Sequence, residues 1–529
     1  MDLQTTENMG MRLLKKSKKS LFRAVFSRGG LFLLLLVLQL IIPFYMLYGR
    51  FSELAVHYYW VTVVIYILAV IYLINTTIDP CGKITWLILI MIAPVFGIGM
   101  LIYTKLDIGH RATKYRVEHI AQITQDIIPQ DPQIMEELKE ISPETFAISQ
   151  YIKRDGCYPV YGNTDVIYCS SGEEKFRRLL EELEKAEKFI FLEYFIIEEG
   201  VMWGKVLDIL ARKVKEGVEV RLMYDGTCEF TSLPHDYPKR LEKLGIKCKM
   251  FAPATPFIST HYNYRDHRKI AVIDGHTAFT GGVNLADEYI NLKKKYGHWK
   301  DAAIMVCGDA VKSFTLMFLH LWFLDEKTID INQFEKYIAY GSKSASSRGF
   351  VIPYADSPMD QEKTGEMVYI DILNRAENYV HIMTPYLILD GEMEAAIKFA
   401  AERGVEVSII LPGIADKKMA NALAKTHYKS LLSSGVKLYE YEPGFVHAKV
   451  FVCDHIRAVV GTINLDYRSL YHHFECAAYM YDSECIDEIE LDFQNTLKKS
   501  RPVTYETIKK EHLIVKIRGQ LLKAFAPLM

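Results

Sequence analysis

The chain has 529 residues, half of them hydrophobic, and a formal net charge of −2. This length allows two folded domains besides membrane segments, and the near-neutral charge argues against a nuclease or another nucleic-acid-binding protein. Nine scattered cysteines without a Cys-x-x-Cys pair suggest neither a zinc site nor a complete disulfide framework.

The N-terminal residues 1–30 form a basic tail. No acidic residue occurs between Met9 and Arg50, whereas Arg12, Lys15, Lys16, Lys18, Lys19, Arg23 and Arg28 are basic. A solvated tail is the alternative. Because an apolar run follows at once, we expect a juxtamembrane segment on anionic lipid.

Three uncharged stretches come next, at 31–48, 54–78 and 84–104. Each is near the roughly 20 residues that a helix needs to cross a bilayer. They predict a membrane anchor over 31–104 with two or three transmembrane segments, hence a multi-pass protein of the cell membrane. The first stretch could instead be a signal peptide, although no cleavage site is clear. The third could be re-entrant, because Pro94 would bend a helix.

Beyond a charged, helical connector at 105–155, strands and helices alternate in the same order twice. The first half has a strand at 189–192, a helix at 204–215 and a strand at 218–223, and the second half has them at 379–383, 393–403 and 405–411. This alternation predicts an α/β sandwich in each half, one over 156–345 and one over 346–529, joined by a linker at 341–347.

One motif occurs in both halves, 180 residues apart. The first copy is His267, Lys269, Asp274, Gly281-Gly282 and Asn284, and the second is His447, Lys449, Asp454, Gly461-Thr462 and Asn464. The equal spacing implies an internal duplication with both halves contributing to one site. For one copy alone, a solvated strand face would explain His-x-Lys about as well.

Each motif predicts a β-hairpin. His and Lys at i and i+2 share a face of an extended segment, and the apolar residues after each Lys suit a buried strand. Asp274-Gly275 reads as a turn, followed by a return strand at 277–280. We expect Asp274 and Asp454 to position backbone within the catalytic motif.

Two such hairpins facing each other would gather imidazoles, ammonium groups and amides around a phosphoryl group. Lys269, Lys449, Asn284 and Asn464 can hold its oxygens, while one His attacks phosphorus and the other protonates the leaving oxygen. The lysines supply the positive charge, so neither a metal nor another cofactor is expected.

Five further residues are candidates for substrate binding. Glu193-Tyr194 and Tyr386 follow the first strand of each half, where tyrosines could pack on a lipid, although filling of the core explains them equally well. Glu288 and Glu475 follow the two asparagines and could each orient an imidazole.

The paired motifs resemble the signature of the phospholipase D superfamily, and their surroundings resemble the bacterial cardiolipin synthases. The resemblance includes the run 263–269, the run 282–289, the Trp-x-Asp segment at 298–301, Thr384-Pro385-Tyr386, Tyr439-Glu440-Tyr441 and the run 464–470 with Glu475 beyond. It covers roughly residues 58–529. The apolar segment before it is a departure from the family pattern.

The resemblance implies a membrane phosphatidyltransferase. One phosphatidylglycerol would transfer its phosphatidyl group to His267, and a second would take it from there, giving cardiolipin and glycerol. His447 would act as acid and base. Expected partners are phosphatidylglycerol, other anionic phospholipids and the membrane, but no nucleic acid. Alternatives are a membrane phospholipase D that uses water as acceptor, and a non-catalytic membrane scaffold.

Overall fold

The computed structural model describes residues 28–48, 55–106, 108–253, 264–340, 347–360 and 362–528. The basic tail up to residue 27 and most of the predicted linker lie outside the described residues. The chain divides into two compact units, one of residues 1–112, 254–263 and 527–529, the other of residues 113–253 and 264–526.

The described part of the first unit is mainly helical. Its helices are α2 (Arg28–Tyr48), α3 (Ala55–Ile74), α4 (Pro80–Ile92) and α5 (Pro94–Leu106). Among the described residues, one helix is long and apolar enough to cross a membrane, Val56–Ile74 within α3, and Phe32–Ile42 and Pro80–Ile92 are shorter apolar helices. Of the two or three predicted spans, one helix among the described residues thus has the required length and composition.

The stretch predicted as a third span is broken into α4 and α5. Pro94 begins α5 directly after the break, because proline has no N–H to continue the α4 hydrogen-bond ladder. Gln39 Oε1 accepts hydrogen bonds from the N–H groups of Val95 (2.9 Å) and Phe96 (3.4 Å), which satisfies two donors at the start of α5. The bend predicted at Pro94 is thus present.

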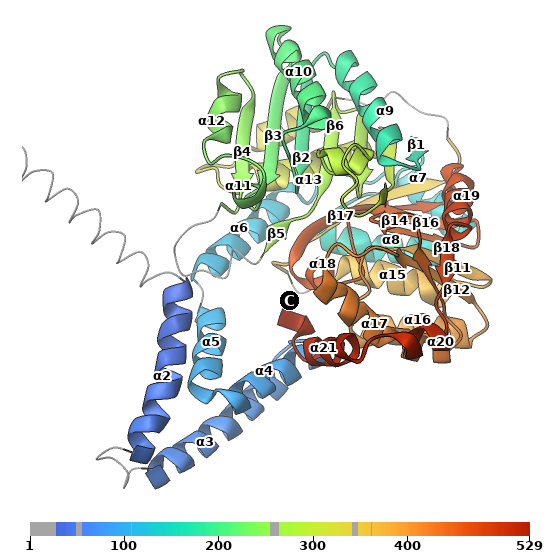
Figure 1. Cartoon of the computed structure of the whole chain (residues 1–529). Helices are drawn as coiled ribbons and strands as arrows, with labels where there is room; N and C mark the ends of the chain where they lie inside the picture. Colours follow the sequence, from blue (N-terminus) through green and yellow to red (C-terminus); the bar gives the residue numbers. More distant parts are fainter. Residues whose placement is uncertain are drawn as a thin grey trace, which may run out of the picture. The chain divides into compact units, whose positions relative to one another are not determined.

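The second unit contains two mixed sheets (Figure 1). The first has the order β1-β9-β7-β6-β2-β3-β4, and the second has the order β10-β17-β16-β15-β11-β12-β13-β18. Up to β13 the two orders correspond strand for strand, so each sheet is one copy of the duplicated fold. The predicted α/β architecture with two repeats is confirmed.

The connector supplies the first three of the following helices, and the first repeat supplies the rest. The helices are α6 (Ile108–Thr124), α7 (Pro132–Ile141), α8 (Pro143–Gly156), α9 (Gly172–Lys185), α10 (Val201–Lys215), α11 (Cys228–Thr231), α12 (Tyr237–Glu242), η3 (Asp287–Ile290), α13 (Val311–Trp322) and α14 (Ile331–Ile338). The strands are β1 (Thr164–Cys169), β2 (Phe189–Tyr194), β3 (Glu219–Asp225), β4 (Lys247–Phe251), β5 (Arg265–Asp266), β6 (Lys269–Ile273), β7 (Thr277–Gly281), β8 (His298–Lys300) and β9 (Ala303–Gly308).

The second repeat continues to the C-terminus. Its strands are β10 (Phe350–Asp356), β11 (Tyr379–Met383), β12 (Glu406–Pro412), β13 (Lys437–Tyr441), β14 (Gly444–Val446), β15 (Val450–Cys453), β16 (Arg457–Gly461), β17 (His473–Tyr481) and β18 (Ser500–Pro502). Its helices are α15 (Thr364–Arg375), α16 (Gly391–Glu402), α17 (Lys418–Ser433), α18 (Tyr467–Tyr471), α19 (Cys485–Leu497), α20 (Tyr505–Lys510) and α21 (Leu513–Lys523), with a final turn η4 (Ala526–Leu528).

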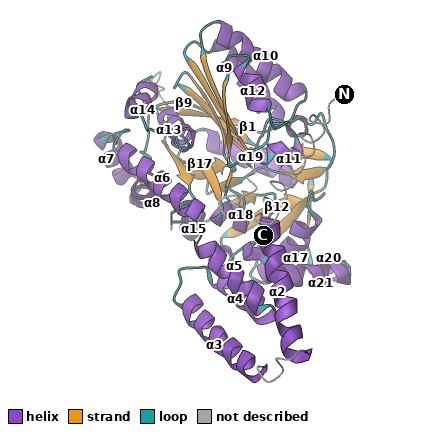
Figure 2. Cartoon of the chain, turned by 90° about the vertical axis from the view of Figure 1, so that its left-hand side faces the viewer, coloured by secondary structure: helices purple, strands orange, loops and turns teal. Residues whose placement is uncertain are grey.

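The two repeats share one hydrophobic core. Helix α13 is buried along nearly its whole length and contacts strands of both sheets, β2 and β6 of the first and β10 of the second. On the other face of the first sheet lie α9 and α10 (Figure 2). Short pairings also join the repeats, since β8 pairs with β14 and β5 pairs with β17, both in parallel. These two pairings lie beside the repeated motifs.

Candidate active site between the two repeats

The repeated motifs form the predicted hairpins. In the first repeat β6 pairs with β7, and in the second β15 pairs with β16, both antiparallel. His267 lies between β5 and β6, and His447 lies between β14 and β15. The backbone N–H of each histidine bonds across to the other repeat, His267 to the carbonyl of Phe474 (2.9 Å) and His447 to that of Lys300 (2.7 Å). The backbone thereby fixes both histidines against the opposite repeat.

The motif aspartates occupy the far ends of these hairpins. Asp274 accepts hydrogen bonds from the N–H groups of residues 187–189 at 2.7–2.8 Å. Asp454 accepts them in the same way from residues 377–379 at 2.7–2.9 Å. Neither aspartate lines the cavity described below. Both hold the start of the neighbouring strand, β2 or β11, in register with the hairpin.

Each imidazole is oriented by a carboxylate from the opposite repeat. His267 Nδ1 lies 2.9 and 3.0 Å from the two oxygens of Glu475, and His447 Nδ1 lies 2.7 Å from Asp301 Oδ2. Both carboxylates are fully buried. A carboxylate on Nδ1 holds the hydrogen there and leaves Nε2 with a free lone pair. The crossed pairing makes each histidine depend on both repeats.

The two carboxylates occupy equivalent register positions. Ala303 pairs with Gly281, and Ala477 pairs with Gly461, so Asp301 and Glu475 each stand two residues before a matched alanine. The residue after the motif glycine differs between the repeats. Thr462 donates its hydroxyl to Glu475 Oε2 at 2.5 Å, whereas a Cβ on Gly282 would meet Asp301 Oδ1 at 2.0 Å. Gly282 is thus required for the close approach of Asp301.

Asp301 is a site residue that the motif comparison did not predict. The sequence predicts that Glu288 and Glu475, which follow the two motif asparagines, each orient an imidazole. The structure corrects this expectation for Glu288: Asp301 contacts His447, and Glu288 stands elsewhere on the cavity wall. The signal that could have found Asp301 was the Trp-x-Asp segment, since Trp299 also packs on the His447 ring at 5.3 Å between centroids.

The two motif lysines are buried beneath the histidines. Lys269 Nζ donates to the carbonyl of His267, and Lys449 Nζ donates to that of His447 and lies 2.9 Å from His447 Nδ1.

Burial lowers the pKa of Lys269 to about 8 and that of Lys449 to about 7. Burial also lowers the pKa of His447 to about 4, with the Lys449 ammonium adding to the effect, and lowers the pKa of His267 well below its usual value. Burial thus favours the neutral form of both imidazoles, and a bound phosphate anion would raise the pKa of all four groups.

The two asparagines differ in their contacts. Asn284 Oδ1 accepts the N–H of Ile196 (3.0 Å), and its Nδ2 donates to the hydroxyl of Tyr289 (2.7 Å). Asn464 is buried, yet its Oδ1 has no hydrogen-bond partner among the described residues. Asn464 consequently has polar capacity left for a ligand, whereas Asn284 is largely engaged.

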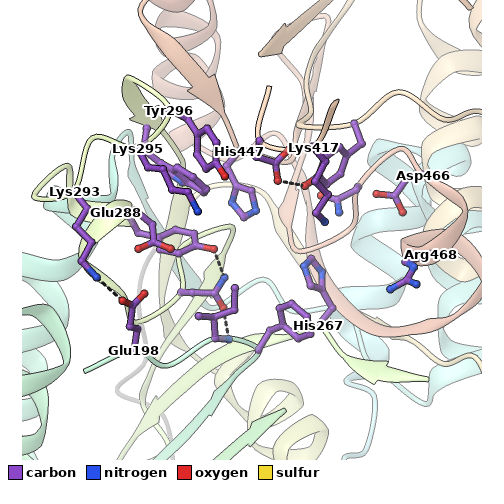
Figure 3. Close-up of a pocket in the computed structure, with 18 of the residues that line it drawn as sticks. Glu198, His267, Glu288, Lys293, Lys295, Tyr296, Lys417, His447, Asp466 and Arg468 are labelled. Carbon is purple, nitrogen blue, oxygen red and sulfur yellow. Dashed lines mark hydrogen bonds and ion pairs between the residues drawn. The ribbon is translucent and has the colours of Figure 1, made fainter. Parts of the chain in front are cut away.

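A single cavity of about 530 Å³ opens over both histidines (Figure 3). Its walls come from both repeats: Phe195, Ile196, Glu198, His267, Asn284, Glu288, Tyr289, Lys293, Lys295, Tyr296, Trp299, Tyr386, Asp416, Lys417, His447, Asn464, Asp466, Arg468 and His473. The predicted Asn284, Asn464, Glu288 and Tyr386 are among them, whereas the buried Lys269 and Lys449 do not line the cavity. Burial raises the pKa of Glu288.

Three predicted substrate-binding residues do not line this cavity: Glu475, which contacts His267 from behind its Nδ1, and the pair Glu193 and Tyr194. Glu193 is fully buried and bonds to Arg268 Nε at 2.6 Å, while the hydroxyl of Tyr194 accepts a hydrogen bond from Lys175 at 2.8 Å. Strand β2 points both side chains into polar contacts of the core. The alternative interpretation, filling of the core, describes their position.

His473 was missed because it belongs to no repeated motif. It lines the cavity, its ring lies 5.3 Å from that of His267, and neither ring nitrogen has a hydrogen bond among the described residues. Its Nδ1 lies 3.6 Å from Glu475 Oε1. By donor type, His267, His473 and Glu475 could hold a metal ion, as could Glu366, Asp390 and Glu392, since each group places its ligand atoms within 4.8 Å of one another.

Known proteins with similar sequences bear on this site. A family described as cardiolipin synthase, PLD-like domain, matches residues 179–322 and 369–497. The chain is 56% identical to an uncharacterized protein of Streptococcus mutans, over 87% of this chain and 99% of that protein. It is 30% identical to the cardiolipin synthase of Alkalihalophilus pseudofirmus, over 85% of this chain and 89% of that protein.

The fold is also similar to that of a solved structure. For the phosphatidylserine synthase of Haemophilus influenzae Rd KW20 the TM-score is 0.54 and the identity 16%, over 73% of this chain and 98% of that one. At this identity the likeness concerns the fold alone. Together with the family match over both repeats, the curated relatives establish that the chain belongs to the cardiolipin synthases with phospholipase D-like domains, a family of phosphatidyltransferase enzymes.

Proposed function

We propose that this protein makes cardiolipin at the cell membrane by transferring a phosphatidyl group from one phosphatidylglycerol to another. The observation that carries the proposal is the crossed pairing of His267 with Glu475 and of His447 with Asp301 around one cavity. It provides two imidazoles with free Nε2 atoms for one phosphodiester. This is the arrangement that a covalent relay with separate nucleophile and acid needs.

In the first step His267 Nε2 attacks phosphorus, and the P–O bond to glycerol breaks. His447, protonated in the complex because the bound anion raises its pKa, gives its proton to the departing oxygen. Lys269, Lys449 and Asn464 stabilise the charge that builds on the non-bridging oxygens. The assignment of His267 as nucleophile follows the family resemblance, since the two histidines are alike chemically.

In the second step the hydroxyl of another phosphatidylglycerol attacks the phosphatidyl-histidine. His447 takes the hydroxyl proton, the P–N bond to His267 breaks, and cardiolipin is formed. One phosphodiester replaces another, so no nucleotide is consumed. The apolar α3 helix would hold the enzyme at the bilayer that contains both lipids.

The test is incubation of the purified full-length protein with phosphatidylglycerol alone. Cardiolipin and free glycerol should appear in equal amounts. Phosphatidic acid as the main product would instead favour a phospholipase D that uses water as acceptor. Dependence on a cytidine-nucleotide lipid would contradict both functions, and absence of any lipid conversion would favour the scaffold.

A further inference from the structure

The acceptor of the proposed reaction carries a phosphate of its own. Cardiolipin contains two phosphodiesters bridged by a glycerol, so the attacking hydroxyl arrives with an anion attached at the far end of that glycerol. In an in-line displacement, the entering and leaving groups lie on opposite sides of phosphorus. If His267 is the leaving nitrogen, the acceptor enters from the side of His447. A second anion must then be accommodated beyond His447.

Two lysines flank His447 at that place, one from each repeat (Figure 3). Lys295 lies in the loop before β8, and Lys417 directly precedes α17. Each ammonium rests on a tyrosine of the cavity wall, Lys295 at 5.2 Å from the ring centre of Tyr296 and Lys417 at 5.1 Å from that of Tyr386. Neither ammonium group makes an ion pair or hydrogen bond within the described parts of the chain.

Most other charged side chains on the cavity wall either have a partner in the protein or do not lie beside His447. Lys293 pairs with Glu198. Asp416 accepts the hydroxyl of Tyr386 at 2.7 Å, and Asp466 accepts the N–H of Ser469 at 2.9 Å to cap α18. Arg468 is drawn toward the His267 side (Figure 3).

Glu288 is the remaining carboxylate on this wall. Its pKa is raised by burial, while Lys293 and Lys295 oppose that shift. Beside His447, the cationic side chains that make no hydrogen bond or ion pair among the described residues are thus Lys295 and Lys417, with Glu288 acting on Lys295 without a direct contact.

We propose that Lys295 and Lys417 form a subsite for the phosphate of the acceptor lipid. This inference rests on the proposed function, and it identifies the residues that select the acceptor. The two ammonium groups hold that phosphate, and the glycerol then spans the distance to the phosphatidyl-histidine. Its hydroxyl gives its proton to His447 as the new P–O bond forms and the P–N bond breaks. Water and free glycerol lack this phosphate and gain nothing from the subsite.

The test compares two reactions of the same intermediate in full-length protein reconstituted with phosphatidylglycerol. One is cardiolipin formation, which uses an anionic acceptor. The other is exchange of radiolabelled free glycerol into phosphatidylglycerol, which uses a neutral one. For the double variant Lys295→Ala/Lys417→Ala, the ratio of cardiolipin formation to glycerol exchange should fall at least about tenfold, since charge-assisted contacts of this kind are lost.

The matched control is Lys294→Ala/Lys418→Ala. These lysines adjoin the proposed pair in sequence, are exposed, and do not line the cavity. The control removes the same charge from the surface, so it accounts for weaker attraction to an anionic membrane. Its ratio should equal that of the unchanged protein, and Lys295→Arg/Lys417→Arg should recover most of the lost ratio.

Each other outcome decides against the subsite. An unchanged ratio in the double alanine variant overturns it, as does an equal fall in the control. A selective fall in Arg468→Ala with none in the lysine pair would place the acceptor on the His267 side and overturn it too. If the unchanged protein exchanges glycerol yet makes no cardiolipin, the proposed function fails and the subsite with it, which the wild-type reaction alone reveals.

Discussion

The two repeats are alike in the strands that carry the site and differ in several residues that lie around it. Both have the same strand order, the same hairpin and an aspartate holding three backbone N–H groups. They differ at Gly282 and Thr462, and in the free capacity of Asn284 and Asn464. They also carry opposite charges at Glu288 and Arg468, each four residues after the motif asparagine.

This contrast shows where duplication is retained and where it has been lost. The shared features fix the backbone, which any phosphoryl-transfer site on this fold requires. The differing features lie on the cavity wall or against the buried carboxylates, and in the proposed mechanism they would allow one half to hold the nucleophile and the other the acid. The two histidines depend on both repeats, because the carboxylate that contacts each of them comes from the opposite repeat.

The largest expected effect separates the two histidines. His267→Ala should reduce turnover by about 10⁴-fold or more and abolish covalent labelling by a phosphatidyl donor, because the nucleophile is gone. His447→Ala should be nearly as slow, but should still label at His267 when the leaving alcohol is acidic enough to depart unprotonated. Acid-quenched labelling with a lipid that carries a good leaving group measures this.

Label found on His447 in the His267→Ala protein would reverse the two roles. Absence of label in the unchanged protein would argue against a covalent intermediate.

The next effect concerns the lysines, which the repeats share. Lys269→Ala or Lys449→Ala should cost about 10²–10³-fold in kcat, since each removes a charge from the phosphate clamp. Retention of near-normal turnover at saturating lipid would exclude a shared phosphate site. Circular dichroism of each variant serves as the control for folding.

The same lysines predict the alkaline side of the pH profile. Their pKa values of about 8 and about 7 are lowered by burial, so the charged, clamping form is lost as pH rises through that range. We expect kcat/KM to fall above about pH 7 for this reason, because Lys449 loses its charge first. The limb in kcat should lie at higher pH, because bound phosphate stabilises the ammonium form. Coincident limbs in both parameters would contradict this explanation.

Sequence predicted the hairpins and their His, Lys and Asn residues, because equal spacing in two copies is visible along the chain. It missed Asp301 because its partner His447 is 146 positions away in the other repeat. The contact between the two residues depends on short strand pairings between the repeats, such as that of β8 with β14. Glu193 was misplaced for a related reason. A strand-end carboxylate can face a cavity or a buried arginine, and Arg268 is the partner here.

Because each carboxylate contacts the histidine of the other repeat, changing a carboxylate in one repeat should impair the histidine of the other. Asp301→Asn should lower kcat about 10²-fold and resemble loss of His447, although Asp301 lies in the repeat of His267. Glu475→Gln should resemble loss of His267 and weaken covalent labelling. The labelling assay used for the histidines distinguishes the two. If Asp301→Asn instead impairs label formation with a good leaving group, the carboxylates do not act through their opposite histidines.

The smallest effect tests the residue that most plainly distinguishes the repeats. Thr462→Ala removes one hydroxyl from Glu475, which keeps its contacts to His267, so a decrease of about tenfold or less is expected. Gly282→Ala is the reciprocal change, yet its Cβ would lie 2.0 Å from Asp301 Oδ1 and 2.9 Å from the carbonyl of His447. The Asp301 carboxylate has to move, so we expect a somewhat larger loss of kcat, caused by slower protonation of the leaving group.

The measurement compares the rate of each variant on a lipid with a poor leaving alcohol and on one with a good leaving alcohol. Gly282→Ala should regain its rate with the good leaving alcohol, because His447 is then dispensable, whereas Thr462→Ala should not. Equal recovery of both would mean that the two positions support the histidines in the same way.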